Sequence, residues 1–308
     1  MKSVFVLGGI NMDYIIHVDK IPSPGESKPG YDFLYSQGGK GANQAIAAKK
    51  LGVNNVYMIA SLGDDYIKDL LLKSIKSYDI DISGVQINGD TSPTCMITFD
   101  DSIKDNFVII NDGSNILVNK YKVESFLKEK AKPGDIFMTV LENNVDAVYH
   151  SLLIAKSLNM YTIFNAAPAQ KLDDSIYKYA DLLVVNESEC YTLSGIKVIN
   201  EEDAIMAYNF FYERGTEDLI ITLGDKGSYY IKDSIVYYTK ALIKDTVDTT
   251  SAGDTFIGAI ASRLSLGDTI TNSLKFSSVA SSITVSRKGS SISIPSLDEV
   301  LSLIDKNK

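Results

Sequence analysis

The sequence predicts an α/β protein with a doubly wound, mostly parallel sheet flanked by helices, together with a small additional β-sheet. The first observation is that short apolar runs, typical of buried strands, alternate with longer segments whose apolar residues recur at helical spacing. Strands joined by helices pair in parallel and leave helices on both faces of the sheet. The second is that a few early segments show a strand-like alternation that does not fit this main sheet. The 308 residues suffice for one large α/β domain or two small ones.

Each element of the main sheet is predicted from a local pattern. Residues 4–7 form an apolar run that Gly8 and Gly9 end, as expected of a buried strand. Residues 38–52 contain a glycine turn and then a helix that Gly52 ends. Further strands are predicted at 56–60, 136–140, 161–165, 182–185 and 219–222. Further helices are predicted at 67–77, 145–158, 202–214 and 272–287.

The small sheet is predicted from strand-like patterns at 31–35, 94–100 and 107–110. In the first of them, Tyr31, Phe33 and Tyr35 alternate with the residues between them. In the later strands both faces carry large apolar side chains, and a sheet that is apolar on two sides needs two covers. The predicted division assigns 1–11, 37–91 and 111–308 to the α/β domain, and 12–36 and 92–110 to the small sheet.

Residues 248–256 carry the strongest indication of chemistry. Three small residues, Ser251 to Gly253, lie between Asp248 and Asp254, and an apolar helix pattern follows them. A small-residue loop that opens a helix presents free backbone N–H groups, which bind an anion together with the helix dipole. Asp254 lies at the same point and can take a proton from an attacking hydroxyl, as phosphoryl transfer to an alcohol requires. The alternative is that Asp254 only caps the helix.

Polar residues follow several predicted strands, at the edge where open α/β sheets usually bind ligands. Asn11 and Asp13 follow the first strand and either hold neighbouring hydroxyls by directed hydrogen bonds or are simply turn residues. Glu142 follows a later strand, and its alternative interpretation is an exposed acid at a helix start. Asn186 and Glu189 follow another strand, and their alternative is a helix cap with an ordinary first-turn acid.

Four strings together resemble the ribokinase family of sugar kinases, of the PfkB type. They are GGKGANQAIAAKKLG at 38–52, NESE at 186–189, TLGDKG at 222–227 and DTTSAGDTF at 248–256, in the family's order and spacing. The resemblance covers essentially the whole chain and implies the ribokinase-like fold. It also implies that the small sheet is a lid over the sugar, whose other face packs on the lid of a second subunit. The alternative is a β-insertion packed within a monomer. Ser251 departs from the commoner Gly or Ala, but it is small enough for the backbone hole to survive.

The resemblance implies an activity and the residues for it. The activity is ATP-dependent phosphorylation of D-ribose to D-ribose 5-phosphate, with Mg²⁺ neutralising the triphosphate and K⁺ as an activating cation. Asp254 would be the general base, and the N–H groups of Ala252 and Gly253, with Ser251 adjoining, would stabilise the transferring group. The residues expected to contact the sugar are Asn11, Asp13, Gly39, Lys40, Asn43, Glu142 and Asp254. Those expected to contact ATP are Asn186, Thr222, Gly224, Gly227, Gly253 and Ser278. Those expected around K⁺ are Asp248, Thr250, Thr284, Arg287, Gly289 and Ser293.

Two further points concern the ions that the resemblance implies. Glu189 would hold Mg²⁺ through bridging water. At the K⁺ position the alternative is that Asp248 forms a surface salt bridge with Arg287 or Lys288.

Composition and charge exclude several classes of function. The formal net charge is −9 and the pI is about 4.8, which argues against broad binding to nucleic acid or anionic membranes. Cys95 and Cys190 give neither a disulfide framework nor a repeated metal-binding pattern, so we expect buried thiols. No apolar run reaches transmembrane length, so no membrane-spanning helix is expected. Asn11 and Asp13 interrupt the short apolar run near the N-terminus, so a signal peptide is not expected either. The expected compartment is therefore the cytoplasm.

Three other functions are left open by the sequence. The nearest is the same chemistry on another acceptor, such as 2-deoxyribose, fructose or adenosine. A non-catalytic sugar or nucleotide sensor is disfavoured because Asp254 and the small-residue hole are both retained. A dinucleotide-dependent oxidoreductase is disfavoured because the glycine-rich string at 38–52 does not match GxGxxG.

Overall fold

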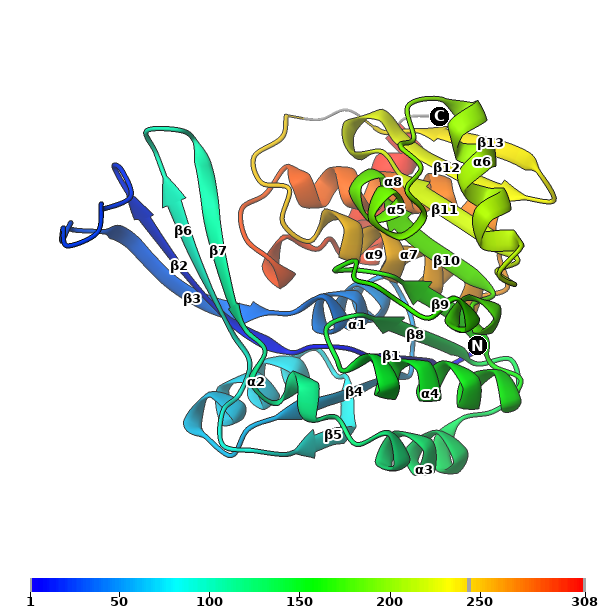
Figure 1. Cartoon of the computed structure of the whole chain (residues 1–308), viewed down its shortest axis with the longest axis horizontal. Helices are drawn as coiled ribbons and strands as arrows, with labels where there is room; N and C mark the ends of the chain where they lie inside the picture. The colour runs from blue at the N-terminus through cyan, green and yellow to red at the C-terminus, as the bar shows by residue number, and fades with distance from the viewer. Residues whose placement is uncertain (1, 243–244, 307–308) are drawn as a thin grey trace.

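A nine-stranded sheet runs through the computed structural model, which describes residues 2–242 and 245–306 (Figure 1). Its strand order is β13-β12-β11-β10-β9-β8-β1-β4-β5, and neighbours are parallel except for the pairs β11–β12 and β12–β13. The strands are β1 Val4–Leu7, β4 Val56–Leu62, β5 Asp81–Ile87, β8 Ile136–Val140, β9 Tyr161–Asn165, β10 Leu182–Asn186, β11 Asp218–Thr222, β12 Gly227–Lys232 and β13 Ile235–Lys240. The predicted mostly parallel α/β sheet is confirmed.

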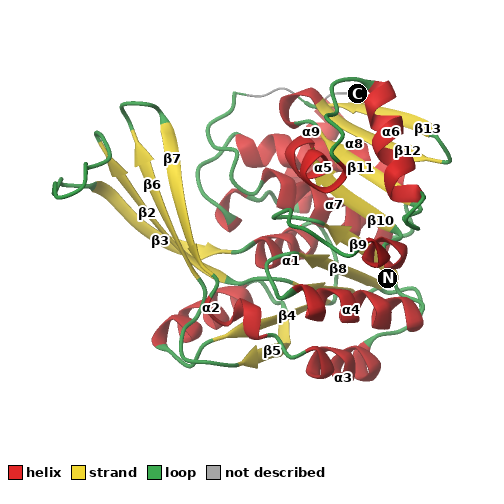
Figure 2. Ribbon diagram, viewed as in Figure 1, coloured by secondary structure: helices red, strands yellow, loops and turns green. Residues whose placement is uncertain are grey.

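Helices cover both faces of this sheet (Figure 2). They are α1 Lys40–Lys50, α2 Tyr66–Ser77, α3 Lys120–Lys130, α4 Val145–Ser157, α5 Glu187–Ser194, α6 Glu201–Tyr212, α7 Ala252–Ser265, α8 Ile270–Val285 and α9 Leu297–Lys306. Buried side chains of α3 to α6 pack on one face with Phe5 and Leu7, whereas those of α1, α2, α7 and α8 pack on the other with Val4 and Val6. A strand buried on both faces is a continuous apolar run, which made β1 predictable.

Elements with mixed or polar sequences were not predicted. The strand β5 lies at the edge of the sheet and most of its residues are partly exposed, so its sequence has no apolar run. Helix α3 buries only Val123 and Leu127, and most of its other residues are polar or charged. The strands β12 and β13 and the helix α9 were missed as well.

The interpretation of Asn11 and Asp13 as turn residues is wrong, because both lie in a strand, β2.

The small sheet projects from the body of the molecule (Figure 1). Its strands are β2 Asn11–Val18, β3 Tyr31–Gly38, β6 Thr94–Asp100 and β7 Asp105–Asn111, in the order β3-β2-β6-β7. Strand β2 pairs antiparallel with β3 and parallel with β6, and β6 pairs antiparallel with β7. Asn11 pairs with Gly38 where the sheet joins the body, so β2 and β3 extend slightly beyond the predicted segment 12–36. The division into two domains stays a prediction.

Helices α1 and α7, whose N-termini carry the predicted site, lie in direct contact. Gly258 of α7 faces α1, and a Cβ at this position would lie 2.5 Å from the Cβ of Ala47 and 2.7 Å from the carbonyl oxygen of Gln44. Close-packed interiors leave no room for a side chain at this separation. The contact therefore fixes the N-termini of the two helices relative to one another.

Two expectations about single features can be compared with the structure. Among the helices in the described residues, none combines the length and the apolar character needed to cross a lipid bilayer. Cys95 and Cys190 are buried free thiols, as predicted.

Candidate active site

A cavity of about 450 Å³ lies at the carboxyl ends of the central strands, between the N-termini of α1 and α7. It is lined by every residue that the sequence predicts to contact the sugar: Asn11, Asp13, Gly39, Lys40, Asn43, Glu142 and Asp254. Cys95, Val108 and Ile110 of the small sheet also line it. The fold thus brings together polar residues from both ends of the chain and places the small sheet beside them.

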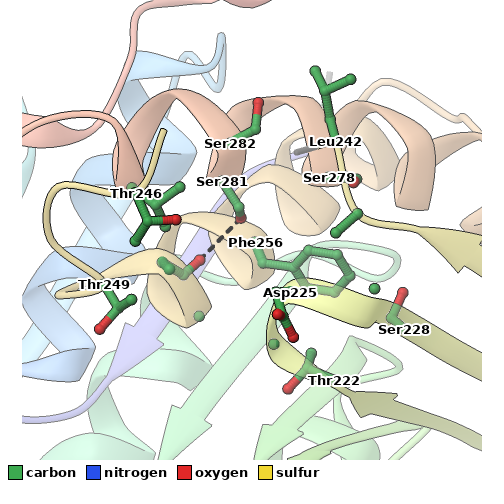
Figure 3. Close-up of a pocket in the computed structure, with 16 residues that line it drawn as sticks. Thr222, Asp225, Ser228, Leu242, Thr246, Thr249, Phe256, Ser278, Ser281 and Ser282 are labelled. Atoms are coloured by element: carbon green, nitrogen blue, oxygen red, sulfur yellow. Dashed lines mark hydrogen bonds between the residues drawn. The ribbon is translucent and has the colours of Figure 1, made fainter. Parts of the chain in front are cut away.

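A second cavity of about 260 Å³ adjoins the first (Figure 3). Thr222, Thr249, Ala252 and Gly253 line both cavities, so the two meet at the N-terminus of α7. Five of the six predicted nucleotide contacts line the second cavity: Thr222, Gly224, Gly227, Gly253 and Ser278. Asn186, the sixth, lines the first cavity instead.

The first turn of α7 presents unequal backbone N–H groups. The N–H of Ala252 donates to the carbonyl oxygen of Thr249 at 3.2 Å, whereas the N–H of Gly253 has no acceptor within the part of the chain that the structure describes. The hydroxyl of Ser281 donates to the carbonyl oxygen of Ala252 at 2.9 Å and ties this turn to α8 (Figure 3). Of the two N–H groups predicted to bind an anion, that of Gly253 is therefore available. The N–H of Ala252 would first have to give up its hydrogen bond to Thr249.

Asp254 lies in the first turn of α7 but does not cap it. The N-cap is Ser251, and the carboxylate of Asp254 accepts hydrogen bonds from Asn43 Nδ2 and Gln44 Nε2, each at 3.2 Å. Burial raises the pKa of Asp254, while the charge of Lys40 and the two amide donors lower it. The interpretation of Asp254 as a helix cap is therefore wrong. A buried carboxylate with a raised pKa, facing a cavity, is suited to accept a proton.

Asp13 is a second buried carboxylate in the same cavity. Burial, and then the carboxylates of Glu142 and Asp254, raise the pKa of Asp13 to about 7. In residues 2–242 and 245–306 no hydrogen-bond donor reaches its carboxylate. Lys40 is the counter-charge: chiefly Asp254, and then Glu142 and Glu189, raise the pKa of its ammonium group against the effect of burial. Asp13 is thus left with free acceptor sites that point to a ligand.

Glu142 fixes the glycine turn before α1. Its Oε2 accepts from the backbone N–H groups of Gly9 at 2.9 Å and Gly41 at 3.0 Å, and its Oε1 accepts from that of Lys40 at 2.8 Å. Burial raises the pKa of Glu142, and the hydrogen bonds from Lys40 and Gly41 lower it. The interpretation of Glu142 as an exposed acid at a helix start is therefore wrong. Gly39, the N-cap of α1, has φ 93°, a conformation that glycine adopts readily.

Asn186 and Glu189 form a capping box at the start of α5. The side chain of Asn186 accepts from the N–H of Glu189 at 2.7 Å, and Glu189 Oε2 accepts from the N–H of Asn186 at 2.8 Å. Both residues also line the larger cavity, and burial raises the pKa of Glu189. Capping and a position at the site therefore coexist, because α5 begins at the carboxyl end of β10.

The predicted cation residues come from the loop before α7, the end of α8 and the segment that follows α8, and the first and last of these are hydrogen-bonded to each other. Asp248 accepts from the backbone N–H of Gly289 at 3.0 Å and from that of Thr250 at 2.9 Å. Arg287 pairs with Glu299, and Asp248 forms no salt bridge within the described residues, so the alternative of a salt bridge between Asp248 and Arg287 or Lys288 is wrong. The remaining two predicted residues are buried, and their hydroxyls donate within the protein: Thr284 to Thr255 and Ser293 to Ser290.

Four polar residues at the site were missed from the sequence. Gln44 and Asn165 bond to each other at 3.1 Å, and Gln44 also holds Asp254. Asn115 donates to Asn11 Oδ1 at 2.9 Å, from the 3₁₀ helix η1 Gly113–Leu117. The fourth, Ser290, donates to Asn43 Oδ1 at 3.2 Å. Gln44 lies inside the glycine-rich string and Asn165 ends a predicted strand, so both were open to prediction, whereas nothing local distinguishes Asn115 and Ser290.

Comparison with known proteins places this site in a family. Residues 1–297 match the model of the pfkB family carbohydrate kinases. A ribokinase from Haemophilus influenzae is 31% identical over 305 residues, which cover 99% of each chain. A bifunctional ribokinase/ribose-5-phosphate isomerase A from Fructilactobacillus sanfranciscensis is 34% identical over 311 residues, which span 100% of this chain but 57% of that longer protein. A deoxyribokinase from Salmonella typhi is 28% identical over 306 residues and 99% of each chain.

The fold agrees with the sequence matches. The crystal structure of a ribokinase from Thermotoga maritima superposes with a TM-score of 0.88, at 30% identity, over 99% of this chain and 100% of that one. The predicted ribokinase-like fold is confirmed.

Replacing Asp13 with Asn should stabilise the ligand-free protein at alkaline pH. A carboxyl group whose folded pKa is raised to about 7 keeps a proton that the unfolded chain has already released. Stability is therefore full below the ordinary pKa of about 4 and falls as the pH rises toward 7. The melting temperature of Asp13→Asn should exceed that of the wild type by a few degrees at about pH 8, with the smallest difference near pH 4.

Thermal unfolding measured across this pH range checks the prediction. Asp32→Asn, which removes an exposed carboxylate from the same small sheet, is the control and should show no pH-dependent gain. A difference between Asp13→Asn and the wild type that stays constant with pH would contradict it.

Proposed function

The chain belongs to the pfkB family of carbohydrate kinases, and on that basis we propose that it transfers the γ-phosphoryl group of ATP to the 5-hydroxyl of D-ribose. The observation that carries the proposal is the position of Asp254, a buried carboxylate that lines the larger cavity, one residue from the open N–H of Gly253, which lines both cavities. A base and an anion donor at one point suit an alcohol that attacks a phosphoryl group.

In the proposed reaction the sugar occupies the larger cavity and ATP the smaller one. Asp254 accepts the proton of the 5-hydroxyl as the hydroxyl oxygen bonds to the γ-phosphorus and the bond to the β–γ bridging oxygen breaks, which releases ADP. The N–H of Gly253 and the ammonium group of Lys40 oppose the negative charge of the transferring group. The small sheet beside the cavity would exclude water, which otherwise competes as the acceptor. With ATP as the donor, the cytoplasm is the proposed compartment.

Asn11 and Asp13 are the proposed contacts that orient the sugar. Asn11 Oδ1 accepts from Asn115, so the Asn11 Nδ2 group is left to donate toward a sugar hydroxyl. Asp13 would accept from neighbouring hydroxyls with the acceptor sites that the protein leaves open. Ribose is favoured because the relative at 31% identity is a ribokinase and the one at 34% identity is a bifunctional ribokinase/ribose-5-phosphate isomerase A. The second candidate is 2-deoxyribose, which the match to a deoxyribokinase favours.

Mg²⁺ is the proposed companion of ATP. Among the described residues no group of three or more His, Cys, Asp and Glu could hold a metal ion, and Glu189 is a single acid at the cavity. Such a donor set fits an ion that is held mainly by phosphate oxygens and water. When bound, Mg²⁺ neutralises charge on the triphosphate. Asn186 and Glu189 are proposed to hold it through water.

A potassium site is proposed between the loop at 247–250 and the end of α8. The N–H groups of Val247 and Asp248 both donate to the carbonyl oxygen of Val285, and Asp248 accepts from Gly289, so the two loops already converge. Backbone carbonyls and a carboxylate are oxygen ligands of the kind that hard cations take. A cation there would fix the loop that leads into the first turn of α7.

The small sheet is the proposed surface for a homodimer. Cross-strand partners share a face: Cys95 and Ile110 face the cavity, whereas Met96 and Ile109 face away from it. The second face continues onto Tyr35, and these three residues are exposed by 52%, 70% and 59% respectively. Contiguous exposed apolar side chains of this kind mark interaction surfaces.

Asp254→Asn should lower kcat for ribose by about 10²- to 10⁴-fold, the usual loss on removal of a general base. Binding of ribose and ATP should change little, because Asn keeps the shape of Asp254 and can still accept from either Asn43 or Gln44. The assay is ADP release from ATP and Mg²⁺ with a panel of ribose, 2-deoxyribose, fructose and adenosine. A variant that keeps most of its kcat, or a wild type that uses none of these acceptors, would refute the proposal.

Exchange of sodium for potassium at constant ionic strength should raise kcat/KM, and Asp248→Ala should erase the difference. The reason is that the cation preorganises the first turn of α7 without touching the substrate. Equal rates in sodium, potassium and a bulky organic cation would exclude the site.

The protein should sediment as a dimer at micromolar concentration, and Ile109→Lys should shift it to the monomer. A charge in the centre of an apolar interface leaves an unpaired, desolvated group. Lys104→Glu, at an exposed position in the turn between β6 and β7, is a matched control and should leave the dimer intact. A fully active wild-type monomer would argue against the interface.

A further inference from the structure

Ser251 opens α7 in a backbone conformation that a serine rarely adopts. Its φ is 60° and its ψ is 10°, in the left-handed region. Glycine occupies this region freely, whereas a side chain is strained there. The hydroxyl of Ser251 also makes no capping hydrogen bond to the helix. A serine at this point is therefore held by something other than the helix that it begins.

The side chains of Ser251, Asn43 and Ser290 form a closed ring of hydrogen bonds. Asn43 Nδ2 donates to Ser251 Oγ at 3.0 Å, and Ser290 Oγ donates to Asn43 Oδ1 at 3.2 Å. The two serine Oγ atoms are 3.0 Å apart. Because the single proton of the Ser290 hydroxyl goes to Asn43, Ser251 must be the donor in the third bond. Each hydroxyl in the ring thus donates once and accepts once.

The ring uses up the amide group of Asn43. One Nδ2 hydrogen goes to Ser251 and the other to Asp254 Oδ2 at 3.2 Å, while Oδ1 accepts from Ser290. Asn43 is only 5% exposed and Ser290 only 3% exposed. Both Nδ2 hydrogens are thus engaged within the protein. These contacts hold Asp254 and the first turn of α7 in place.

The three members of the ring come from three separate segments. Asn43 lies in the first turn of α1, Ser251 is the N-cap of α7, and Ser290 follows Gly289, whose N–H donates to Asp248. The peptide that carries the N–H of Ala252 begins at the carbonyl of Ser251, so the φ and ψ of Ser251 set the direction of that N–H. The ring therefore couples the sugar side of the site to the backbone donors at the phosphoryl side.

We propose that Ser251 and Ser290 are positioning residues for phosphoryl transfer. Their hydroxyls hold the first turn of α7 in its left-handed start and keep the amide of Asn43 aimed at Asp254. This inference rests on the proposed kinase function and names residues that act through Asn43 and the backbone rather than on the substrate.

The test compares Ser251→Ala, Ser251→Gly, Ser290→Ala and the double variant Ser251→Ala/Ser290→Ala, at saturating potassium and Mg²⁺. Each single variant removes a hydroxyl that makes two neutral hydrogen bonds in the ring, and this loss should lower kcat by about 3- to 10-fold, with a smaller change in the KM for ATP. Ser251→Gly should melt no lower than Ser251→Ala, because glycine removes the backbone strain. The double variant should be no slower than the slower single variant, since either change opens the same ring.

A pH profile separates positioning from a general loss of structure. Opening the ring weakens the hydrogen bond from Asn43 to Asp254, and losing a donor to the carboxylate raises the pKa of Asp254. The acidic limb of the plot of kcat/KM against pH should therefore move to higher pH. The charged groups around Asp254, namely Lys40, Asp13, Glu142 and Glu189, are unchanged in all the variants. Ser262→Ala is the matched control on α7. It removes a buried hydroxyl bond to the carbonyl of Leu51, at 2.6 Å, and should lower the melting temperature without moving this limb.

Two results would overturn the inference: wild-type kcat and pH profile in both single alanine variants, or losses that multiply in the double variant. A wild type that phosphorylates no acceptor would instead refute the proposed function. In that case, hydrogen exchange of the backbone amides at 252–255 tests whether the ring positions the first turn of α7. Exchange must accelerate alike in Ser251→Ala and Ser290→Ala, and not in Ser262→Ala; unchanged exchange in the first two would refute the ring's role.

Discussion

One ammonium group, that of Lys40, faces four carboxylates in the larger cavity, and the arrangement of the site follows from this imbalance. Burial raises the pKa of all four carboxyls, those of Asp13, Glu142, Glu189 and Asp254. Backbone N–H groups stabilise Glu142 and Glu189, and side-chain amides stabilise Asp254. Asp13 has no such donor in the described part of the chain. A ligand that brings hydroxyl donors to Asp13 therefore supplies hydrogen bonds that the described residues do not provide.

The framework that holds these charges was predictable because burial on both faces imposes a simple pattern. The central strands β1, β8 and β9 are apolar throughout or nearly so, and their observed bounds equal the predicted ones. Edge strands such as β5 face solvent on one side and do not need that pattern. The positions of Asp13 and Glu142 were also predictable, since ligands of open α/β sheets gather where strands end. The position of Asp254 was predictable from the small-residue turn that opens α7.

What each site residue touches was not predictable, because the partners are distant in sequence. A carboxylate at the start of a helix is compatible with a cap, and only the approach of α1 shows that Asp254 accepts from Asn43 and Gln44 instead. The sequence around Glu142 does not indicate that its carboxylate accepts hydrogen bonds from three backbone N–H groups. Ser290 lies in a short polar turn, and its bond to Asn43 spans 247 positions of the chain. Local propensity carries no information about such pairs.

The contact between α1 and α7 links the two halves of the site mechanically. Gly258 lets the helices approach until no side chain fits between them, so α7 cannot tilt without displacing α1. Asn43 on α1 bonds to both Asp254 and Ser251, and Glu142 holds the turn that starts α1. In the proposed reaction, a sugar that orders the start of α1 would therefore also order Asp254 and the backbone donors on α7. Ordering by the acceptor itself favours its hydroxyl over water, because water fills the same cavity without making those contacts.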